Sequence, residues 1–317
     1  LSDIHFSGNE GYEISRMRDS LIEKVKEIIS VDKNINFIVV SGDLVYQNAS
    51  YNSQLTNFLE SIIKICNISK NDLFIVPGNH DLKRGQTRTL LLEGIRKDNF
   101  KFAKDTVDQL QKDFKKYKSF FKKIKNQDED YLYKVEKRDK YNVFLMNTAF
   151  TAGTDEDDGN LMLEKNSFYD EIKQLKDQDD KINIAIGHHP VKCFVGESQE
   201  KIWNNFNDYN IDFYLCGHLH KGAYNYELNA GRVIPTYQCG SGRVDDYATV
   251  TFMVGELDLN TQKGKITSYK WLINEECWTI GGMDGRKAIT GEIEFALDRF
   301  QKENNSEIEN EEVNEDE

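Results

Sequence analysis

The stretch Phe37-Ile38-Val39-Val40-Ser41-Gly42-Asp43 decides the fold expected for this chain of 317 residues. Its apolar, mostly β-branched run predicts a strand that is buried on both faces. The run ends at a serine and a glycine, and a carboxylate follows them directly. Because open α/β sheets place their ligand sites at the carboxyl ends of strands, we expect Asp43 to lie at a functional site.

Four other stretches repeat this pattern, in which polar residues follow the end of a strand. They are Leu1–His5, Phe74–Asp81, Ile182–Pro190 and Ile211–His220. All six histidines of the chain lie in these four stretches. A single histidine is usually a surface residue or a satisfied core residue. Six histidines confined to four strand ends, with Asp and Asn beside them, instead indicate a shared metal site.

Length and composition favour one large domain with a sizeable core, because 38% of the 317 residues are hydrophobic. The longest apolar runs have the length of strands and are too short to span a membrane. Five cysteines without a CxxC pair argue against a disulfide scaffold or a thiolate zinc site, and they favour a reduced, cytoplasmic location. The chain lacks an initial methionine and begins two residues before Asp3, so we expect a trimmed sequence.

The formal net charge of −13 is unevenly distributed along the chain. Residues 301–317 hold eight acids and one lysine, a net charge of −7, and residues 1–300 carry the remaining −6. Such a mildly acidic body gives no general support for nucleic-acid binding. Residues 301–317 are poor in apolar residues and rich in Glu and Asn. This composition predicts an acidic disordered tail or linker after a single domain at 1–300.

Strand and helix patterns alternate along the first two thirds of the chain. Helical spacing of apolar residues predicts four amphipathic helices, at Tyr12–Ile29, Gln54–Cys66, Lys165–Asp177 and Glu197–Tyr209. After His220 the pattern becomes mainly β, with runs at Gly231–Tyr237, Thr249–Leu259 and Lys265–Leu272. This order predicts a layered α/β fold in which a second sheet packs on the first.

Residues 98–126 carry a different pattern, in which apolar residues recur every four and three positions. They are Ala103, Val107, Leu110, Phe114, Tyr117, Phe121 and Ile124. The spacing predicts one long helix with a heptad seam, inserted into the domain. From Lys101 to Lys125 the segment also holds nine lysines against three aspartates. We expect a solvated basic face; the alternative is a contact with a nucleic-acid backbone or a partner helix near the site.

The polar residues at the strand ends form five short motifs along the chain. They are Asp3-x-His5, Gly42-Asp43, Gly78-Asn79-His80-Asp81, Gly187-His188-x-Pro190 and Gly217-His218-x-His220. This arrangement resembles the calcineurin-like metallophosphoesterase superfamily over about 220 of the 317 residues. The resemblance implies a four-layer α-β-β-α sandwich with two packed mixed sheets and a metal site at the carboxyl ends of the strands.

The donor set fits two metal ions on chemical grounds alone. Mixed carboxylate and imidazole ligands suit Mn, Fe, Zn or Co, and the absence of thiolates argues against a closed structural zinc. Seven ligands are too many for one ion. A carboxylate has two oxygens and can bridge two ions about 3.5–4 Å apart, the separation used by enzymes that cleave phosphoesters.

The resemblance implies a role for each motif residue. One metal ion would be held by Asp3, His5 and His220, the other by Asn79, His188 and His218, with Asp43 bridging both. A water or hydroxide between the ions would be the nucleophile. His80 would stabilise or protonate the leaving-group oxygen, and Asp81 would hold the His80 ring in position. His189 and Arg243 are weaker candidates for contacts with the substrate, since the segment before Arg243 also fits a plain turn.

The residues within the motifs narrow the implied activity to one branch of the superfamily. Ser-Asp-Ile-His, Gly-Asp-Leu, Gly-Asn-His-Asp and His-His-Pro are most similar to the bacterial class III cyclic-nucleotide phosphodiesterase branch. Phosphoprotein phosphatases differ, because they carry an arginine shortly after Gly-Asp and a glutamate after Asn-His. Tyr46, three residues after Asp43, leaves open a tyrosinate ligand like that of the purple acid phosphatases.

The resemblance therefore implies a phosphodiesterase that acts on a nucleotide or a related diester with two Mn, Fe or Zn ions. Two alternatives remain at this point. One is a metal-dependent nuclease acting on DNA or RNA. The other is a metal-holding interaction module within a larger protein with further fused domains.

Overall fold

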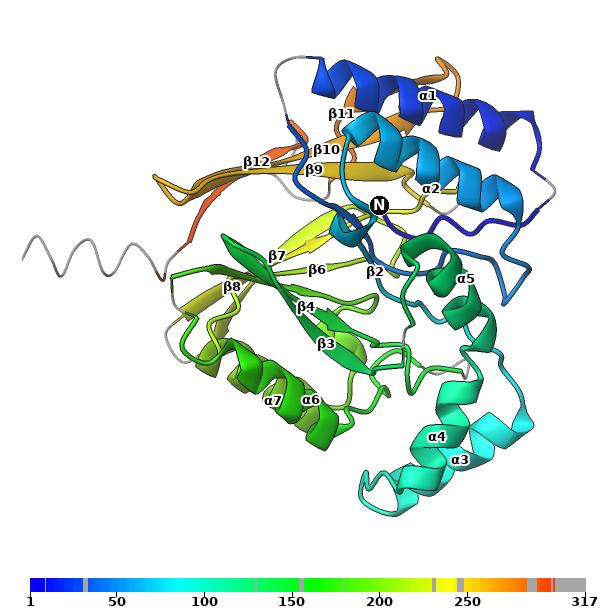
Figure 1. The fold of residues 1–317 in the computed structure, drawn as a ribbon, viewed down its shortest axis with the longest axis vertical. Helices are drawn as coiled ribbons and strands as arrows, with labels where there is room; N and C mark the ends of the chain where they lie inside the picture. Colours follow the sequence, from blue (N-terminus) through cyan, green and yellow to red (C-terminus); the bar gives the residue numbers. More distant parts are fainter. Residues whose placement is uncertain are drawn as a thin grey trace, which may run out of the picture.

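The structure is a computed structural model of the chain (Figure 1). It describes residues 1–299, except residues 9, 31–33, 129, 154–156, 179, 230–231, 244–247, 284–289 and 298. The predicted acidic tail at 301–317 lies outside the described residues. Among the described helices, none is both long enough and apolar enough to cross a membrane.

The larger sheet has six strands in the order β3-β4-β5-β6-β8-β7. The strands are β3 (Tyr133–Lys137), β4 (Tyr141–Met146), β5 (Ile182–Ile186), β6 (Phe213–Cys216), β7 (Ala223–Asn229) and β8 (Arg232–Gln238). The central strands β4, β5, β6 and β8 run parallel, whereas β3 and β7 pair in the antiparallel direction at the edges. The parallel pairing brings the carboxyl ends of β5 and β6, where His188 and His218 follow, to the same end of the sheet.

The second β layer contains two smaller sheets. In one, β1 (Ile38–Val40) pairs in parallel with β2 (Leu73–Ile75). The other is antiparallel and contains β9 (Thr251–Asp258), β10 (Lys263–Leu272), β11 (Cys277–Ile280) and β12 (Glu292–Ala296). Among the described residues, the ladder of β1 does not extend to β9. An apolar cavity of about 780 Å³, lined in part by Val39, Leu215 and Phe252, lies between the layers.

Helices cover both outer faces of the paired β layers (Figure 1). On one side lie α1 (Tyr12–Ile29) and α2 (Ser53–Cys66), and on the other α6 (Lys165–Ile172) and α7 (Gly196–Asp208). The apolar side of α1 packs through Met17 and Leu21 in one core cluster with Trp271 and Trp278. The four predicted amphipathic helices and the α-β-β-α order of layers are therefore confirmed.

The predicted long helix at 98–126 is wrong, because the chain turns at Asp113 and Phe114 and forms two helices. These are α4 (Lys104–Lys112) and α5 (Lys115–Lys125). Another helix, α3 (Gln86–Lys97), precedes them and was not predicted.

The apolar residues of α4 and α5 explain why their spacing did not reveal the break. Leu110 and Phe114 pack in the core beneath the six-stranded sheet. Tyr117, Phe121 and Ile124 pack instead with the residues of β1 and β2. The apolar residues thus stay buried on both sides of the turn, those of α4 in the core of the six-stranded sheet and those of α5 in the core around β1 and β2.

Arg88 on α3 ties this helical region to the body of the domain. Its guanidinium donates hydrogen bonds to the carbonyl oxygens of Phe150 at 2.5 Å, Ala152 at 2.6 Å and Leu110 at 3.3 Å. It also forms an ion pair with Asp113 at 2.9 Å. A single buried side chain therefore joins α3, the end of α4 and the loop that follows β4.

We predict that Arg88→Met lowers the free energy of unfolding by about 3 kcal/mol, because several buried carbonyl groups and Asp113 lose their donor. Urea-induced unfolding, followed by circular dichroism, measures this loss. The matched control is Lys97→Met at an exposed position of the same helix, which should change stability by less than about 0.5 kcal/mol. Equal losses in the two variants would contradict the assigned role of Arg88.

Candidate metal centre

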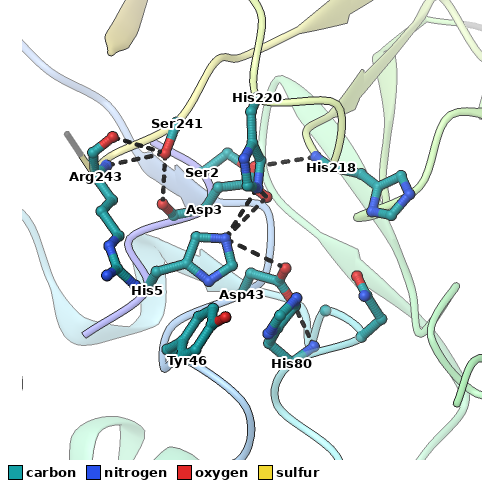
Figure 2. A network of polar contacts seen from close by, with 12 residues as sticks. Ser2, Asp3, His5, Asp43, Tyr46, His80, His218, His220, Ser241 and Arg243 are labelled. Atoms are coloured by element: carbon teal, nitrogen blue, oxygen red, sulfur yellow. Dashed lines mark hydrogen bonds and ion pairs between the residues drawn. The ribbon is translucent and has the colours of Figure 1, made fainter. Parts of the chain in front are cut away.

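The segment that carries Asp3 and His5 runs beside the end of β1. The Leu1 amino group donates to the Val39 carbonyl at 2.9 Å, and the Asp3 N–H donates to the Gly42 carbonyl at 3.0 Å. The His5 N–H donates to the Asp43 carbonyl at 2.9 Å. These backbone bonds place the side chains of Asp3, His5 and Asp43 at one site (Figure 2), although about forty residues separate Asp43 from the other two in the sequence.

One group of donors contains Asp3, His5, Asp43 and His220. Each presents one ligand atom, and these atoms all lie within 4.8 Å of one another. Asp3 Oδ1 is 3.8 Å from His5 Nε2 and 3.4 Å from His220 Nε2. The two imidazole nitrogens are 3.0 Å apart. We call these four residues the first cluster; they are the set predicted for one metal ion together with its bridge.

A second group of donors lies around His188. Ring nitrogens of His188, His189 and His218 lie within 4.8 Å of one another. Asn79 Oδ1 is 3.0 Å from His188 Nε2. We call Asn79, His188 and His218 the second cluster. The structure thus brings together the residues predicted for the other ion, with His189 beside them.

Asp43, a member of the first cluster, also faces the second cluster. Its Oδ2 is 3.7 Å from His5 Nε2 and 3.4 Å from His188 Nε2. Its Oδ1 accepts the backbone N–H of His80 at 2.8 Å, which fixes the orientation of the carboxylate. One carboxylate oxygen therefore faces both groups of nitrogen donors, as a bridging ligand must.

The charge balance of the site tests whether cations fit it. Asp3 and Asp43 are 0% and 1% exposed. Among the described residues, their ionic partners within 4.0 Å are histidines only. Asp3 Oδ1 also has no hydrogen-bond donor. Buried carboxylates without a lysine or arginine are costly, so the donor set fits metal cations.

The geometry agrees with what comparison with known proteins shows. The sequence profile described as "Calcineurin-like phosphoesterase" matches residues 1–222, a span that includes both clusters. The chain belongs to the calcineurin-like phosphoesterase family. A protein of Bacillus subtilis (strain 168), named "Uncharacterized metallophosphoesterase-like protein YydB", is 31% identical over 325 residues, which cover 98% of this chain. The chain spans 66% of the length of that relative.

Solved structures with a similar fold are more distant in sequence. The GAP50 structure, described as the anchor in the inner membrane complex of Plasmodium, is 14% identical with a TM-score of 0.48, covering 95% of this chain and 91% of that chain. Vps29 of Chaetomium thermophilum is 9% identical with a TM-score of 0.39, covering 94% and 93%. Likeness at this level concerns the fold alone.

The backbone of this calcineurin-like phosphoesterase is strained at the candidate metal centre. Five residues of the two clusters have φ between 46° and 76°: Asp3, His5, Asp43, His218 and His220. Residues other than glycine rarely adopt these angles, and each costs about 1–3 kcal/mol unless the surroundings impose it. Such strain concentrates at functional sites, and here it coincides with the predicted ligands.

Glycines let the motif loops approach one another. A Cβ atom at Gly78 would overlap Asp43 Oδ1, and one at Gly217 would overlap Ser2 Oγ. Ser2 in turn donates a hydrogen bond to Asp3 Oδ2. The glycines in Gly-Asn-His-Asp and Gly-His-x-His are therefore required by close contact between loops.

The His80 ring is held by the backbone of Gln47, not by Asp81 as predicted. The Gln47 N–H donates to His80 Nδ1 at 3.1 Å. Because a backbone N–H can only donate, Nδ1 accepts and the neutral ring carries its hydrogen on Nε2.

Asp81 instead connects the loops that carry Asp43 and Asn79. It accepts the N–H groups of Leu44 at 3.1 Å and Gly78 at 2.9 Å, and the Tyr51 hydroxyl at 2.7 Å. Burial, and next the charge of Asp43, raise the pKa of Asp81 to about 7. The predicted role of Asp81 is wrong because its carboxylate is engaged by these donors, of which Leu44 and Tyr51 lie in the loop after β1 that only the fold brings close.

Tyr46 and Arg243 form one wall of the site (Figure 2). The Tyr46 ring stacks on His80 with centroids 5.2 Å apart and meets the edge of His5 at 5.8 Å. Arg243 Cζ lies 4.9 Å from the Tyr46 centroid, and its buried Nε has no hydrogen-bond partner among the described residues. Arg243, predicted as a weak substrate candidate, thus lies beside the first cluster.

Sequence analysis missed two groups that orient the histidines. The Ser41 carbonyl lies 2.7 Å from His188 Nδ1, so Nδ1 carries a hydrogen and Nε2 faces Asp43 and Asn79. The Thr148 hydroxyl lies 3.1 Å from His189 Nδ1. Thr148 follows the end of β4, just as the motif residues follow the ends of other strands. This position in the sequence could have identified Thr148 as a residue of the site.

We predict that Gly78→Ala lowers the affinity for Mn²⁺ at least about tenfold, because the new methyl group displaces Asp43. Metal binding measured by isothermal titration calorimetry tests this. Gly94→Ala on α3 is the matched control, since a Cβ there meets nothing within 4 Å. Unchanged affinity in the Gly78 variant would show that Asp43 does not contribute to the metal site.

We also predict that metal binding strengthens with rising pH. Burial alone would lower the pKa of His188, but Asp43 and Asp3 outweigh it and raise this pKa to about 9. Below that pH a cation must displace a proton from His188, so affinity should rise up to about tenfold per pH unit between pH 7 and 9. Calorimetry in buffers with different ionisation enthalpies measures the released proton. Affinity independent of pH in this range would contradict the assignment of His188 as a ligand.

Proposed function

We propose that this chain is a phosphodiesterase that hydrolyses a nucleotide or a related diester with two metal ions, of Mn, Fe or Zn. The observation that carries the proposal is the position of Asp43, whose Oδ2 faces His5 on one side and His188 on the other. Bound cations of this kind lower the pKa of water toward neutrality and offset negative charge on phosphoryl oxygens.

Each cluster would hold one ion. Asp3, His5 and His220 would bind one, Asn79, His188 and His218 the other, and Asp43 would bind both. The Ser41 carbonyl supports this assignment for His188, because it keeps the hydrogen on Nδ1 and leaves Nε2 free to bind. The buried Asp3 Oδ1, which accepts no hydrogen bond from the described residues, supports it for the first cluster.

His80 would stabilise charge on the leaving-group oxygen. Burial lowers the pKa of His80 although Asp43 opposes the shift, so the ring is neutral at pH 7. Gln47 holds Nδ1 as an acceptor, and Nε2 therefore offers a hydrogen for a hydrogen bond. This role needs no direct contact between His80 and a metal ion.

The preference for a diester rests on the similarity of the motif residues to those of a phosphodiesterase branch, and on the wall formed by Tyr46 and Arg243. A diester has a second organic substituent on phosphorus, and Tyr46 is 40% exposed beside the first cluster. Its ring and the Arg243 guanidinium would contact such a substituent by aromatic contact and by hydrogen bonds.

A nuclease remains the second candidate because α5 reaches the rim of the site. Lys116 Nζ donates to the Asn48 carbonyl at 2.7 Å, and the Asn48 N–H donates to the His80 carbonyl. However, Lys118 and Lys122 pair with Asp130 and Asp128, at 2.9 Å and 2.8 Å. The basic surface is therefore smaller than the count of nine lysines suggests, which favours a small substrate.

A phosphoester panel on metal-stripped protein, with Mn, Fe, Zn or Mg added back, tests the proposal. We expect hydrolysis of a bis-aryl phosphate but not of a mono-aryl phosphate. Cleavage of single-stranded DNA at a comparable rate, with strong inverse dependence on salt, would favour the nuclease instead. Metal binding without any hydrolysis would favour a metal-holding interaction module.

We predict that Asp43→Asn lowers turnover more than about a hundredfold, beyond the 10–100-fold loss typical of residues that only orient a ligand. The amide oxygen carries no negative charge, so it binds cations at both clusters far more weakly than the carboxylate does. The control is Asp130→Asn, which removes an exposed carboxylate paired with Lys118. Turnover near that of the unaltered protein in Asp43→Asn would rule out the bridging role.

A further inference from the structure

His189 differs from its neighbour His188 in the groups that hold its ring. His188 Nδ1 faces the Ser41 carbonyl at 2.7 Å, whereas His189 Nδ1 faces the Thr148 hydroxyl at 3.1 Å. Both side chains are fully buried. A carbonyl can only accept a hydrogen bond, but a hydroxyl can donate or accept. The other bonds of Thr148 therefore decide which nitrogen of His189 carries a hydrogen.

The hydrogen-bonding capacity of Thr148 is fully used. Its Oγ1 accepts the backbone N–H groups of His188 and His189, each at 3.0 Å. A hydroxyl has two acceptor lone pairs and one hydrogen to donate. With both lone pairs occupied, the hydrogen of Thr148 goes to His189 Nδ1. That nitrogen is an acceptor, so the neutral His189 ring carries its hydrogen on Nε2.

His189 Nε2 is thus a buried donor with no partner among the described residues. Its ring lies against the second cluster, with centroid distances of 4.7 Å to His188 and 4.4 Å to His218. The Tyr214 hydroxyl donates to the His189 carbonyl at 2.6 Å, which fixes the backbone as Thr148 fixes the ring. An unpaired buried N–H is costly, and this one is fixed in place for an acceptor from outside the chain.

We propose that His189 is not a metal ligand and that its Nε2–H donates a hydrogen bond to a non-bridging phosphoryl oxygen of the substrate at the second cluster. The inference rests on the proposed phosphoesterase function and adds a substrate-binding residue to it. A ring nitrogen that carries a hydrogen has no lone pair for a cation. A phosphoryl oxygen is an acceptor only, and a fixed donor beside it stabilises the charge that develops during transfer.

Nitrogen-15 NMR of the histidines tests the position of the hydrogen without any activity measurement. The chain has only six histidines, so their long-range proton–nitrogen correlations can be resolved, and the spectrum of His189→Gln identifies His189. We expect His189 to keep its hydrogen on Nε2 in metal-free and Zn²⁺-loaded protein, and Thr148→Ser to preserve this state. Loss of the Nε2 hydrogen on loading with Zn²⁺ would show a metal ligand and overturn the proposal.

Binding experiments on the Zn²⁺-loaded protein test the contact with phosphate. His189→Ala should keep the zinc content of the unaltered protein, measured by mass spectrometry, whereas His188→Ala should lose zinc. The affinity of His189→Ala for inorganic phosphate should fall at least about tenfold. His189→Gln, which can place an amide N–H near the position of Nε2, should recover most of this loss. Unchanged phosphate affinity in His189→Ala would contradict the proposal.

Kinetics separate this inference from the proposed function. With a diester that the protein hydrolyses, His189→Ala should lower kcat by about 10²–10³-fold, as expected for loss of one fixed donor. If no phosphoester is hydrolysed, the proposed function fails, while the NMR and phosphate-binding results still decide the role of His189. If a diester is hydrolysed and His189→Ala has the kcat of the unaltered protein, only the role of His189 fails.

Discussion

The burial of the Asp43 carboxylate between two sets of histidines is the constraint on which the rest of the site depends. Its Oδ2 lies 3.4 Å from His188 Nε2 and 3.7 Å from His5 Nε2. Burial would raise the pKa of Asp43, but the imidazoles of His188, His5 and His80 hold it well below its usual range. The carboxylate therefore stays ionised, and its charge must be offset within the site rather than by solvent.

The backbone is strained at the residues that surround that charge. The left-handed angles at Asp3 and His218 turn both side chains toward the site, and the His218 N–H donates to Asp3 Oδ2 at 3.0 Å. Backbone bonds from Asp3 and His5 to the end of β1 hold the first strained segment in place. The strain is thus maintained by hydrogen bonds between segments, and bound cations would relieve the repulsion between its buried carboxylates.

The sequence predicted the strand ends and the polar residues that the fold brings together beside them, because these are local patterns. An apolar run, a glycine and an acid or histidine can be read without knowing the fold. The break between α4 and α5 could not be predicted, since the apolar stripe continues through Asp113 and Phe114 while the core beneath it changes. Two partners of Asp81, the Leu44 N–H and the Tyr51 hydroxyl, could not be predicted either, because they lie in the loop after β1, which only the fold brings close.

His188 and His189 show most directly what residue types alone leave undetermined. They are adjacent, equally buried and chemically identical, and ring nitrogens of both lie close to His218. A count of donors would assign both to the same cation. The Ser41 carbonyl and the saturated Thr148 hydroxyl impose opposite tautomers on the neutral rings, so neutral His188 presents a lone pair and neutral His189 a hydrogen. A site that binds both a cation and an anionic phosphoryl group needs one lone pair and one hydrogen. Both rings follow β5, and Thr148, which fixes the hydrogen of His189, follows the neighbouring parallel strand β4.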